Sequence, residues 1–171
     1  PIAVLQELVN LGIDSTLITK GLAQITQHLF ERKDAPGRIL TTDLALFSVT
    51  PGASERPMEH ELVATVEEAV RGDFSCVKVL LIFGMDKDIE MKNMKHVADL
   101  AADCDRWNMP LMVEPVMWGD AIPKEKKLDP EYIEHAARIA LELGCDILKM
   151  PYNGDVASFA DLIRRFSVPV V

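Results

Sequence analysis

The feature that most limits the fold of this chain is the regular alternation of two kinds of segment. Short runs rich in β-branched and other apolar residues predict strands, and amphipathic stretches with helical spacing lie between them. The predicted strands cover residues 15–19, 38–42, 76–82, 109–114, 146–150 and 168–171. Such an alternation of strand and helix predicts a parallel sheet with helical crossovers.

The predicted helices lie on either side of these runs. They cover residues 2–10, 21–32, 65–70, 91–107, 129–143 and 158–165. The helix over 129–143 has the clearest boundaries, because Pro130 lies in its first turn and Gly144 follows its end. Between residues 43 and 61 the chain carries two prolines, a glycine and several polar residues, which predict a long loop.

Two architectures are compatible with about six strands in this order. One is an open, doubly wound α/β sheet, and the other is a (β/α)8 TIM barrel that lacks some of its parts. A closed barrel has eight strands and about 250 residues, whereas this chain has 171. In either case the length suffices for one hydrophobic core, so we expect a single domain over residues 1–171.

Composition and charge limit the partners. The net charge of −9 argues against binding nucleic acid through its phosphates, although a small phosphorylated molecule needs only a few local cations. No apolar run is long enough to cross a bilayer, and the sequence begins without a basic leader. We therefore expect a cytoplasmic protein with no membrane partner. The histidines lack metal-ligand spacing, so we expect surface histidines and no metal site; they are His28, His60, His96 and His135.

Three ionisable residues stand inside or at the end of apolar strands. They are Lys78, Glu114 and Lys149. Lysine and glutamate are rarely buried unless they are paired, because removing a charge from water is costly. In a parallel barrel, the carboxyl ends of successive strands meet at one mouth, so residues far apart in sequence become neighbours there. We expect these three side chains to lie together.

Two lysines and a carboxylate in a sheltered site suit carbonyl chemistry. A lysine attacks a carbonyl only as the neutral amine, and burial and a second cation both favour that form. One lysine would then be the nucleophile, the other the neighbouring cation, and Glu114 the proton shuttle. This chemistry needs neither a metal nor an organic cofactor. An ordinary structural role, such as pairing of a lysine with Asp146, remains an alternative, and spacing does not identify which lysine attacks.

The segment around Lys149 resembles a known family. Residues 134–155 read EHAARIALELGCDILKMPYNGD, which is similar to the archaeal-type class I fructose-bisphosphate aldolases, a group of the DeoC/LacD-like Schiff-base aldolases. In that family the lysine of the matching strand forms the Schiff base. The resemblance therefore implies that Lys149 is the nucleophile and that the fold is a (β/α)8 barrel.

Two further segments resemble the related tagatose-bisphosphate aldolases. Residues 76–84 are similar to a strand whose lysine lies in the active site, which implies such a place for Lys78. Residues 110–115, PLMVEP, are similar to the strand that carries an acid-base glutamate, which implies that role for Glu114. The resemblance follows nearly the whole chain in the order and spacing of its elements.

The chain departs from the family pattern in two respects. Where the archaeal fructose-bisphosphate aldolases carry a catalytic tyrosine, this chain has Val116, Met117 and Trp118, so we prefer Glu114 as the acid-base residue. The family's first strand with its Asp-His-Gly motif and its last glycine-rich phosphate loops have no counterpart here. We therefore expect an incomplete barrel, which lacks the first strand and the C-terminal strands. Such a barrel has open strand edges, so the chain is expected to be a poor catalyst alone or to associate, as a homo-oligomer.

Residues beside the three charged side chains are candidates for substrate binding. Tyr152, Asn153, Gly154 and Asp155 follow the Lys149 strand, although Asn-Gly is also a common turn. Asp43 follows the strand over 38–42 and could accept a hydrogen bond from a sugar hydroxyl, although it could equally cap the next segment.

The expected activity is cleavage or formation of a carbon–carbon bond in a phosphorylated ketose. Fructose 1,6-bisphosphate is the substrate that the resemblance implies first. The same lysine would also suit a tagatose-bisphosphate or deoxyribose-phosphate aldolase, a transaldol synthase or a thiolase-like acyl transferase, because the fold does not choose among them. A noncatalytic fragment is the alternative from a different class.

Overall fold

The main sheet is parallel and has five strands. The computed structural model describes residues 1–46 and 59–171. The strands are β1 (Ser15–Ile18), β2 (Gly37–Thr41), β5 (Cys76–Ile82), β6 (Leu111–Val116) and β7 (Ile147–Leu148), in the spatial order β1-β2-β5-β6-β7. Every neighbouring pair is parallel. A parallel bridge between Leu148 and Val170 places the last predicted strand beside β7.

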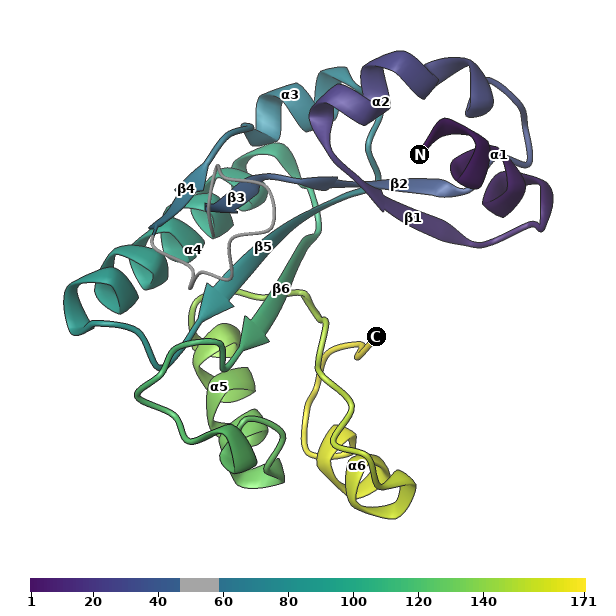
Figure 1. Ribbon diagram of the computed structural model, residues 1–171. Helices are drawn as coiled ribbons and strands as arrows, with labels where there is room; N and C mark the ends of the chain where they lie inside the picture. The colour runs from purple at the N-terminus through teal and green to yellow at the C-terminus, as the bar shows by residue number, and fades with distance from the viewer. Residues whose placement is uncertain (47–58) are drawn as a thin grey trace.

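The order of the strands decides between the two architectures that the sequence allowed. Along the sheet, the five strands follow one another in the same order as along the chain, without a reversal. A doubly wound sheet reverses its order at a switch point, whereas a (β/α)8 barrel winds in one direction only. Figure 1 shows a curved sheet with the helices following one another around its outer side. The chain has the winding of an incomplete (β/α)8 barrel, as expected.

The helices lie close to their predicted positions. They are α1 (Ile2–Asn10), α2 (Lys20–Thr26), α3 (Val66–Arg71), α4 (Lys87–Trp107), α5 (Pro130–Glu142) and α6 (Val156–Ile163), with short 3-10 turns at Gln27–Leu29 and Lys124–Lys126. The longest, α4, begins four residues earlier than predicted because the Asp86 side chain caps it by accepting the Asp88 N–H. Among the helices of the described residues, none is both long enough and apolar enough to cross a membrane.

The predicted loop over residues 43–61 is wrong at both ends. Strands β3 (Asp43–Leu46) and β4 (Glu59–Leu62) form an antiparallel pair with Asp43 opposite Leu62. Residues 47–58 of that prediction lie outside the described residues. The two strands are short and their support comes from each other and from α4 rather than from local sequence, which is why the prolines and glycine between them suggested a loop.

The two faces of the sheet have different roles. Side chains alternate between the faces of a strand, and the outward residues of β5 and β6 form one apolar core with the helices. These outward residues include Val77, Val79, Leu81, Leu111 and Val113. The inner face carries Lys78 and Glu114 between apolar residues, of which Leu80, Ile82 and Val116 form a separate buried cluster. The main apolar core therefore lies between the outer face of the sheet and the helices, and the charged residues lie on the inner face.

Side chains complete the edge of β5 where β2 leaves the sheet. The pairing of β2 with β5 ends at Thr41 and Lys78, and Thr42 N–H then donates to the Lys78 carbonyl at 3.0 Å. Beyond this point the Asp43 carboxylate accepts the Leu80 N–H at 2.7 Å. Asn93 of α4 accepts the Ile82 N–H at 2.5 Å and donates to the Leu80 carbonyl at 3.3 Å. Because buried backbone groups need partners, Asp43 and Asn93 stand in for a neighbouring strand.

This edge makes Asn93 a strong determinant of stability. Asn93 is 2% exposed, and Asn93→Ala leaves the Ile82 N–H and the Leu80 carbonyl without their side-chain partners. We expect the free energy of unfolding to fall by about 3 kcal/mol, measured by urea denaturation. Lys95→Ala on the exposed side of the same helix is the matched control, with an expected change within about 0.5 kcal/mol. Equal effects of the two substitutions would contradict this role.

Candidate active site

The three charged residues that the sequence singled out meet on the inner face of the sheet. Lys78 lies within β5, Glu114 lies in β6, and Lys149 follows β7 directly. The Nζ atom of Lys78 is 2.8 Å from Oε2 of Glu114. The Nζ atom of Lys149 forms an ion pair and hydrogen bond with the other oxygen, Oε1. One carboxylate therefore bridges two lysines from different strands.

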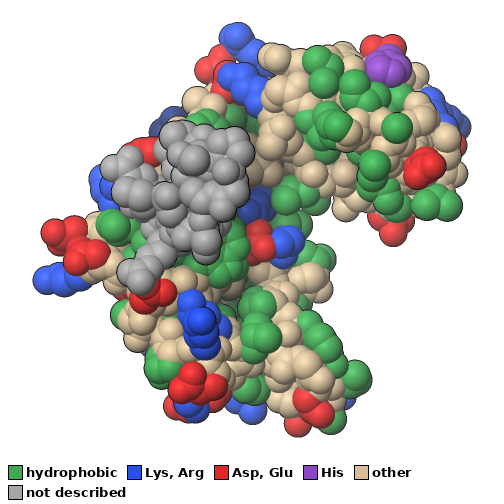
Figure 2. All heavy atoms as spheres, viewed as in Figure 1, with side chains coloured by type: hydrophobic (Ala, Val, Ile, Leu, Met, Phe, Trp, Pro, Cys, Tyr) green, Lys and Arg blue, Asp and Glu red, His purple; other side chains and the backbone are tan. Residues whose placement is uncertain are grey.

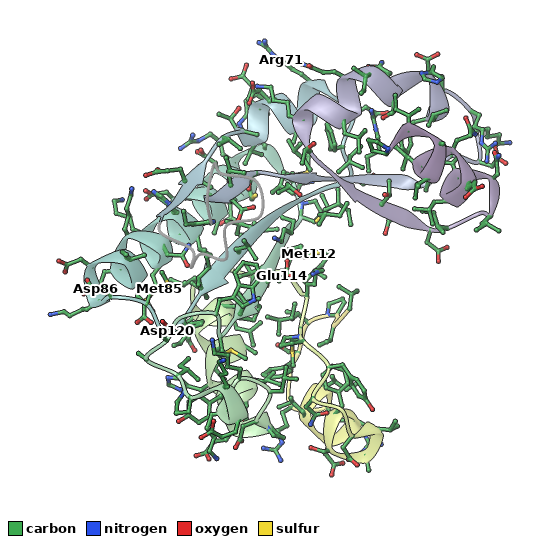
Figure 3. All side chains as sticks on the ribbon, viewed as in Figure 1. Arg71, Met85, Asp86, Met112, Glu114 and Asp120 are labelled. Atoms are coloured by element: carbon green, nitrogen blue, oxygen red, sulfur yellow. The ribbon has the colours of Figure 1, made fainter. Side chains whose placement is uncertain are left out.

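Backbone register explains why these side chains meet. Leu80 of β5 is the partner of Glu114 in β6, and the Lys149 N–H donates to the Val113 carbonyl at 3.0 Å. Figure 3 places Glu114 and Met112 on the open side of the curved sheet, as residues two apart on a strand should be. Figure 2 shows acidic and basic side chains together on the wall of the hollow in this side.

Burial differs strongly among the three side chains. The Lys78 side chain is 5% exposed and that of Glu114 is 17% exposed, whereas the Lys149 side chain is 39% exposed. The Lys149 side chain is therefore the more accessible of the two lysines. Burial thus separates the two lysines, which spacing in the sequence did not.

The lysines keep Glu114 ionised despite its burial. Burial alone raises the pKa of the Glu114 carboxyl, but hydrogen bonds from Lys149 and Lys78 outweigh it, so this pKa lies below its usual value of 4.5. A carboxyl whose pKa is lowered by folding stabilises the fold above its unfolded pKa, and that contribution is lost as the pH falls through the lowered value. At neutral pH Glu114 is therefore a carboxylate and able to accept a proton.

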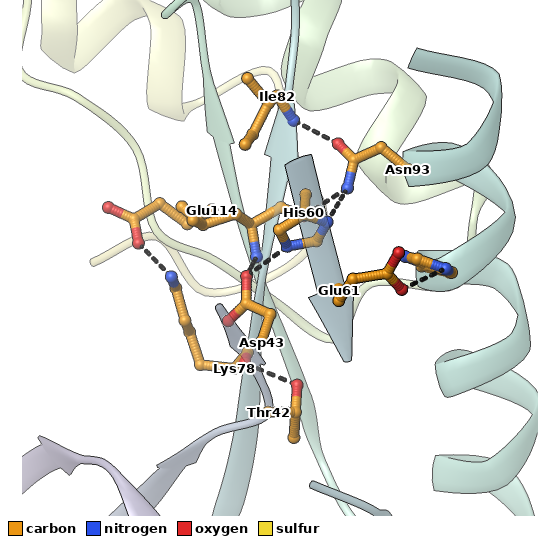
Figure 4. A network of polar contacts seen from close by, with 10 residues as sticks. Thr42, Asp43, His60, Glu61, Lys78, Ile82, Asn93 and Glu114 are labelled. Carbon is orange, nitrogen blue, oxygen red and sulfur yellow. Dashed lines mark hydrogen bonds and ion pairs between the residues drawn. The ribbon is translucent and has the colours of Figure 1, made fainter. Parts of the chain in front are cut away.

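A second network of polar contacts lies beside the lysine–carboxylate cluster (Figure 4). Nε2 of His60 is 2.7 Å from Oδ2 of Asp43, and Nδ1 of His60 is 2.6 Å from the amide nitrogen of Asn93. The Asn93 oxygen faces the Ile82 N–H, so its nitrogen is the donor to Nδ1. Nδ1 is then the acceptor of the ring and Nε2 carries the hydrogen given to Asp43.

The sequence did not predict this network of Asp43, His60 and Asn93. His60 was predicted to lie on the surface, and that prediction is wrong, because the residue is 4% exposed. Asn93 was not singled out at all. His60 belongs to a strand that was read as part of a loop, and Asn93 differs from other polar residues of its helix only in facing β5. The burial of both residues depends on partners from other elements, which the local sequence does not show.

The candidates for substrate binding have structural roles in the described state. Asn153 accepts the Asp155 N–H at 3.2 Å, and Asp155 caps α6 by accepting the Ser158 N–H at 2.6 Å. Gly154 has a φ of 89°, which suits a turn at glycine. Tyr152 is half exposed and packs edge-on against Phe159, with ring centroids 5.4 Å apart. Contact of this loop with a substrate stays a prediction.

Asp43 is the candidate whose surroundings differ most from those expected. It begins β3 and does not cap a helix, and its side chain is 0% exposed. Its carboxylate is held by the Leu80 N–H and by His60. Direct contact with a substrate therefore stays a prediction, and the burial of the side chain favours a positioning role.

The described residues offer little to a metal ion. Across residues 1–46 and 59–171 there is no group of three His, Cys, Asp or Glu side chains placed to hold one. The acidic residue nearest to both lysines, Glu114, is already engaged by two ammonium groups. The arrangement is suited to proton transfer and to attack by an amine.

Comparison with known proteins identifies relatives along the whole chain. The 2-amino-4,5-dihydroxy-6-oxo-7-(phosphonooxy)heptanoate synthase of Streptomyces griseus is 30% identical over 96% of this chain and 56% of its own length. The 2-amino-3,7-dideoxy-D-threo-hept-6-ulosonate synthase of Halobacterium salinarum is 28% identical over 99% of this chain and 59% of its own length. This chain thus spans somewhat more than half of these relatives.

A solved structure shows the same fold. An archaeal fructose-1,6-bisphosphate aldolase, with its catalytic lysine covalently bound to the carbinolamine intermediate of the substrate, superposes with a TM-score of 0.80. It is 27% identical, and the match covers 100% of this chain and 63% of that one. The family model of the DeoC/LacD family aldolases matches residues 1–171. This chain therefore belongs to the DeoC/LacD aldolase family.

Proposed function

We propose that this protein is a Schiff-base aldolase in which Lys149 condenses with the ketone of a phosphorylated ketose. The observation that carries the proposal is the contact of a partly exposed Lys149 with the partly buried Glu114 carboxylate. An amine in contact with a carboxylate has a proton acceptor at hand, and its exposure leaves room for a carbonyl. The family and the sequence around Lys149 support the same assignment.

The proposed reaction begins with a proton transfer. Glu114 accepts one proton from the Lys149 ammonium, and the neutral amine attacks the ketone to form a carbinolamine. Glu114 then returns the proton to the carbinolamine hydroxyl, which leaves as water and yields an iminium ion. No redox step occurs, and the carboxylate ends in the state in which it began.

Cleavage follows from the electron demand of the iminium. The bond between the α carbon and the β carbon of the iminium breaks, and its electron pair forms an enamine on Lys149. The hydroxyl on the β carbon loses its proton to Glu114 as that portion leaves as an aldehyde. Reprotonation of the enamine and hydrolysis release the second product. The reverse sequence forms the bond, so the same site serves cleavage and synthesis.

Lys78 orients the proton shuttle. Its ammonium holds Oε2 of Glu114 at 2.8 Å, which leaves Oε1 directed at Lys149. A side chain only 5% exposed is poorly placed to attack a substrate itself. Its proposed contribution is a fixed positive charge beside the carboxylate.

Fructose 1,6-bisphosphate is the first substrate we propose. The solved archaeal aldolase that matches this chain carries that name. The two synthases suggest a second candidate, because both names describe a seven-carbon amino compound with a ketone at carbon 6. These are the compounds that the synthases are named for forming, and a ketone is the group that a lysine amine can capture, so either compound suits Lys149. The proposed binding loop is Tyr152, Asn153, Gly154 and Asp155.

Trapping of the Schiff base tests the nucleophile. Incubation of the protein with fructose 1,6-bisphosphate and sodium borohydride should reduce the imine to a stable amine and add the mass of the trapped sugar to Lys149. We expect Lys149→Met to abolish the adduct, whereas Lys95→Met, on the exposed face of α4, should retain it. An adduct on Lys78, or one that persists in Lys149→Met, would overturn the assignment.

Substitution of the proton shuttle tests the second role. Glu114→Gln keeps the shape of the side chain but cannot accept a proton, so we expect turnover to fall by about 10²–10⁴-fold. Steady-state rates at pH 7 measure this loss, and Glu131→Gln on the exposed start of α5 is the matched control. Full activity of Glu114→Gln would exclude Glu114 as the acid-base residue.

A further inference from the structure

Asp43 has one carboxylate oxygen that the fold does not use. Both donors, the Leu80 N–H and His60 Nε2, bind the same oxygen, Oδ2, each at 2.7 Å. Within the described residues, Oδ1 is buried and has no hydrogen-bond partner. Because a buried carboxylate oxygen without a donor is costly, such an atom calls for an explanation.

The direction of this oxygen is fixed by its neighbours. His60 is oriented by Asn93, which is itself bound to the backbone of Leu80 and Ile82. Rotation of the Asp43 carboxylate would break both bonds to Oδ2. These contacts hold Oδ1 in the direction in which it points.

Lys78 is the group best placed to use it. The Thr42 N–H and hydroxyl both bind the Lys78 carbonyl, so Asp43 follows a residue that is anchored to Lys78. Figure 4 shows the Lys78 side chain running from its strand past Asp43 to Glu114. A substrate is a poor alternative, because the Asp43 side chain is 0% exposed. The other nearby charges are engaged on the helix side of the hairpin, where Glu61 pairs with Lys92 and approaches His96.

We propose that Asp43 is a positioning residue that receives Lys78 from Glu114 whenever Glu114 takes up a proton. In the described state Lys78 is bound to Glu114 at 2.8 Å. When Glu114 becomes neutral, the buried ammonium loses its counter-charge, which is strongly unfavourable unless another anion replaces it. Oδ1 of Asp43 supplies that anion. Lys78 keeps all its protons, and only its ion-pair partner changes.

The use of this exchange in turnover rests on the proposed function, in which Glu114 gains and returns a proton. The exchange would make each protonation of Glu114 less costly and would return Lys78 to Glu114 when the carboxylate reforms. The ion-pair exchange itself needs no substrate. It can therefore be tested without assuming that the protein is an aldolase.

A double-mutant cycle on stability tests the exchange. Asp43→Asn can keep the oxygen that binds Leu80 and His60 and replace only Oδ1 by an amide nitrogen, and Glu114→Gln removes the present partner of Lys78. Each single substitution leaves Lys78 one carboxylate. We expect the double variant to lose more than the sum of the single shifts in its urea midpoint at pH 7, by at least about 0.5 M.

Lys78→Met provides the decisive background, because it removes the ammonium that would be stranded. There the two substitutions should become additive, and a double variant that does not fold should fold again. Glu61→Gln makes the same carboxylate-to-amide change on β4 and is the matched control, with additive shifts expected alongside Glu114→Gln. Additive losses in the wild-type background, or an excess loss that persists with Met at position 78, would overturn the proposal. Failure of Lys149 to form a Schiff base would bear on the proposed function alone.

Discussion

The candidate site depends on one partly buried carboxylate shared by two ammonium groups. Glu114 lies between Lys78 and Lys149, and without it the fold would hold two like charges close together on the inner face of the sheet. Removal of a charge from water is tolerated only with such compensation. Parallel strands β5, β6 and β7 lie side by side in this order, so three residues distant in sequence can meet this requirement. The adjacency of these three parallel strands is thus a condition for the charge arrangement.

The departure of β2 from the sheet links the fold to this cluster. A continuous β2 would satisfy the edge of β5 with backbone atoms alone. Instead, the chain turns into β3, and Asp43 and Asn93 supply the missing partners through their side chains. These side-chain contacts place the Asp43 carboxylate at Leu80, two residues from Lys78 along β5, and bring His60 beside Asp43. The hairpin is therefore part of the support of the site as well as a cover for the strand edge.

The sequence predicted the strands and the charged cluster because both leave a local signal. A lysine within an apolar strand is conspicuous since its burial is costly, so Lys78 and Lys149 stand out from the residue pattern alone. The hairpin, His60 and Asn93 leave no such signal, because their roles come from partners on other elements. His60 has a partner in Asp43 across its hairpin and another in Asn93 on α4. A polar residue on a helix is expected to be exposed unless its buried neighbours are known.

The gradient of exposure across the cluster separates roles that chemistry alone leaves equal. Lys78 and Lys149 contact the same carboxylate, yet their side chains are 5% and 39% exposed. In the proposed function, the buried ammonium of Lys78 serves as a constant charge, whereas the more accessible amine of Lys149 forms the covalent bond with a substrate. Relatives of this fold bear the names of aldolases and of synthases. A lysine paired with a carboxylate suits both directions of carbon–carbon chemistry, so the choice of substrate must depend on groups that surround the cluster rather than on the cluster itself.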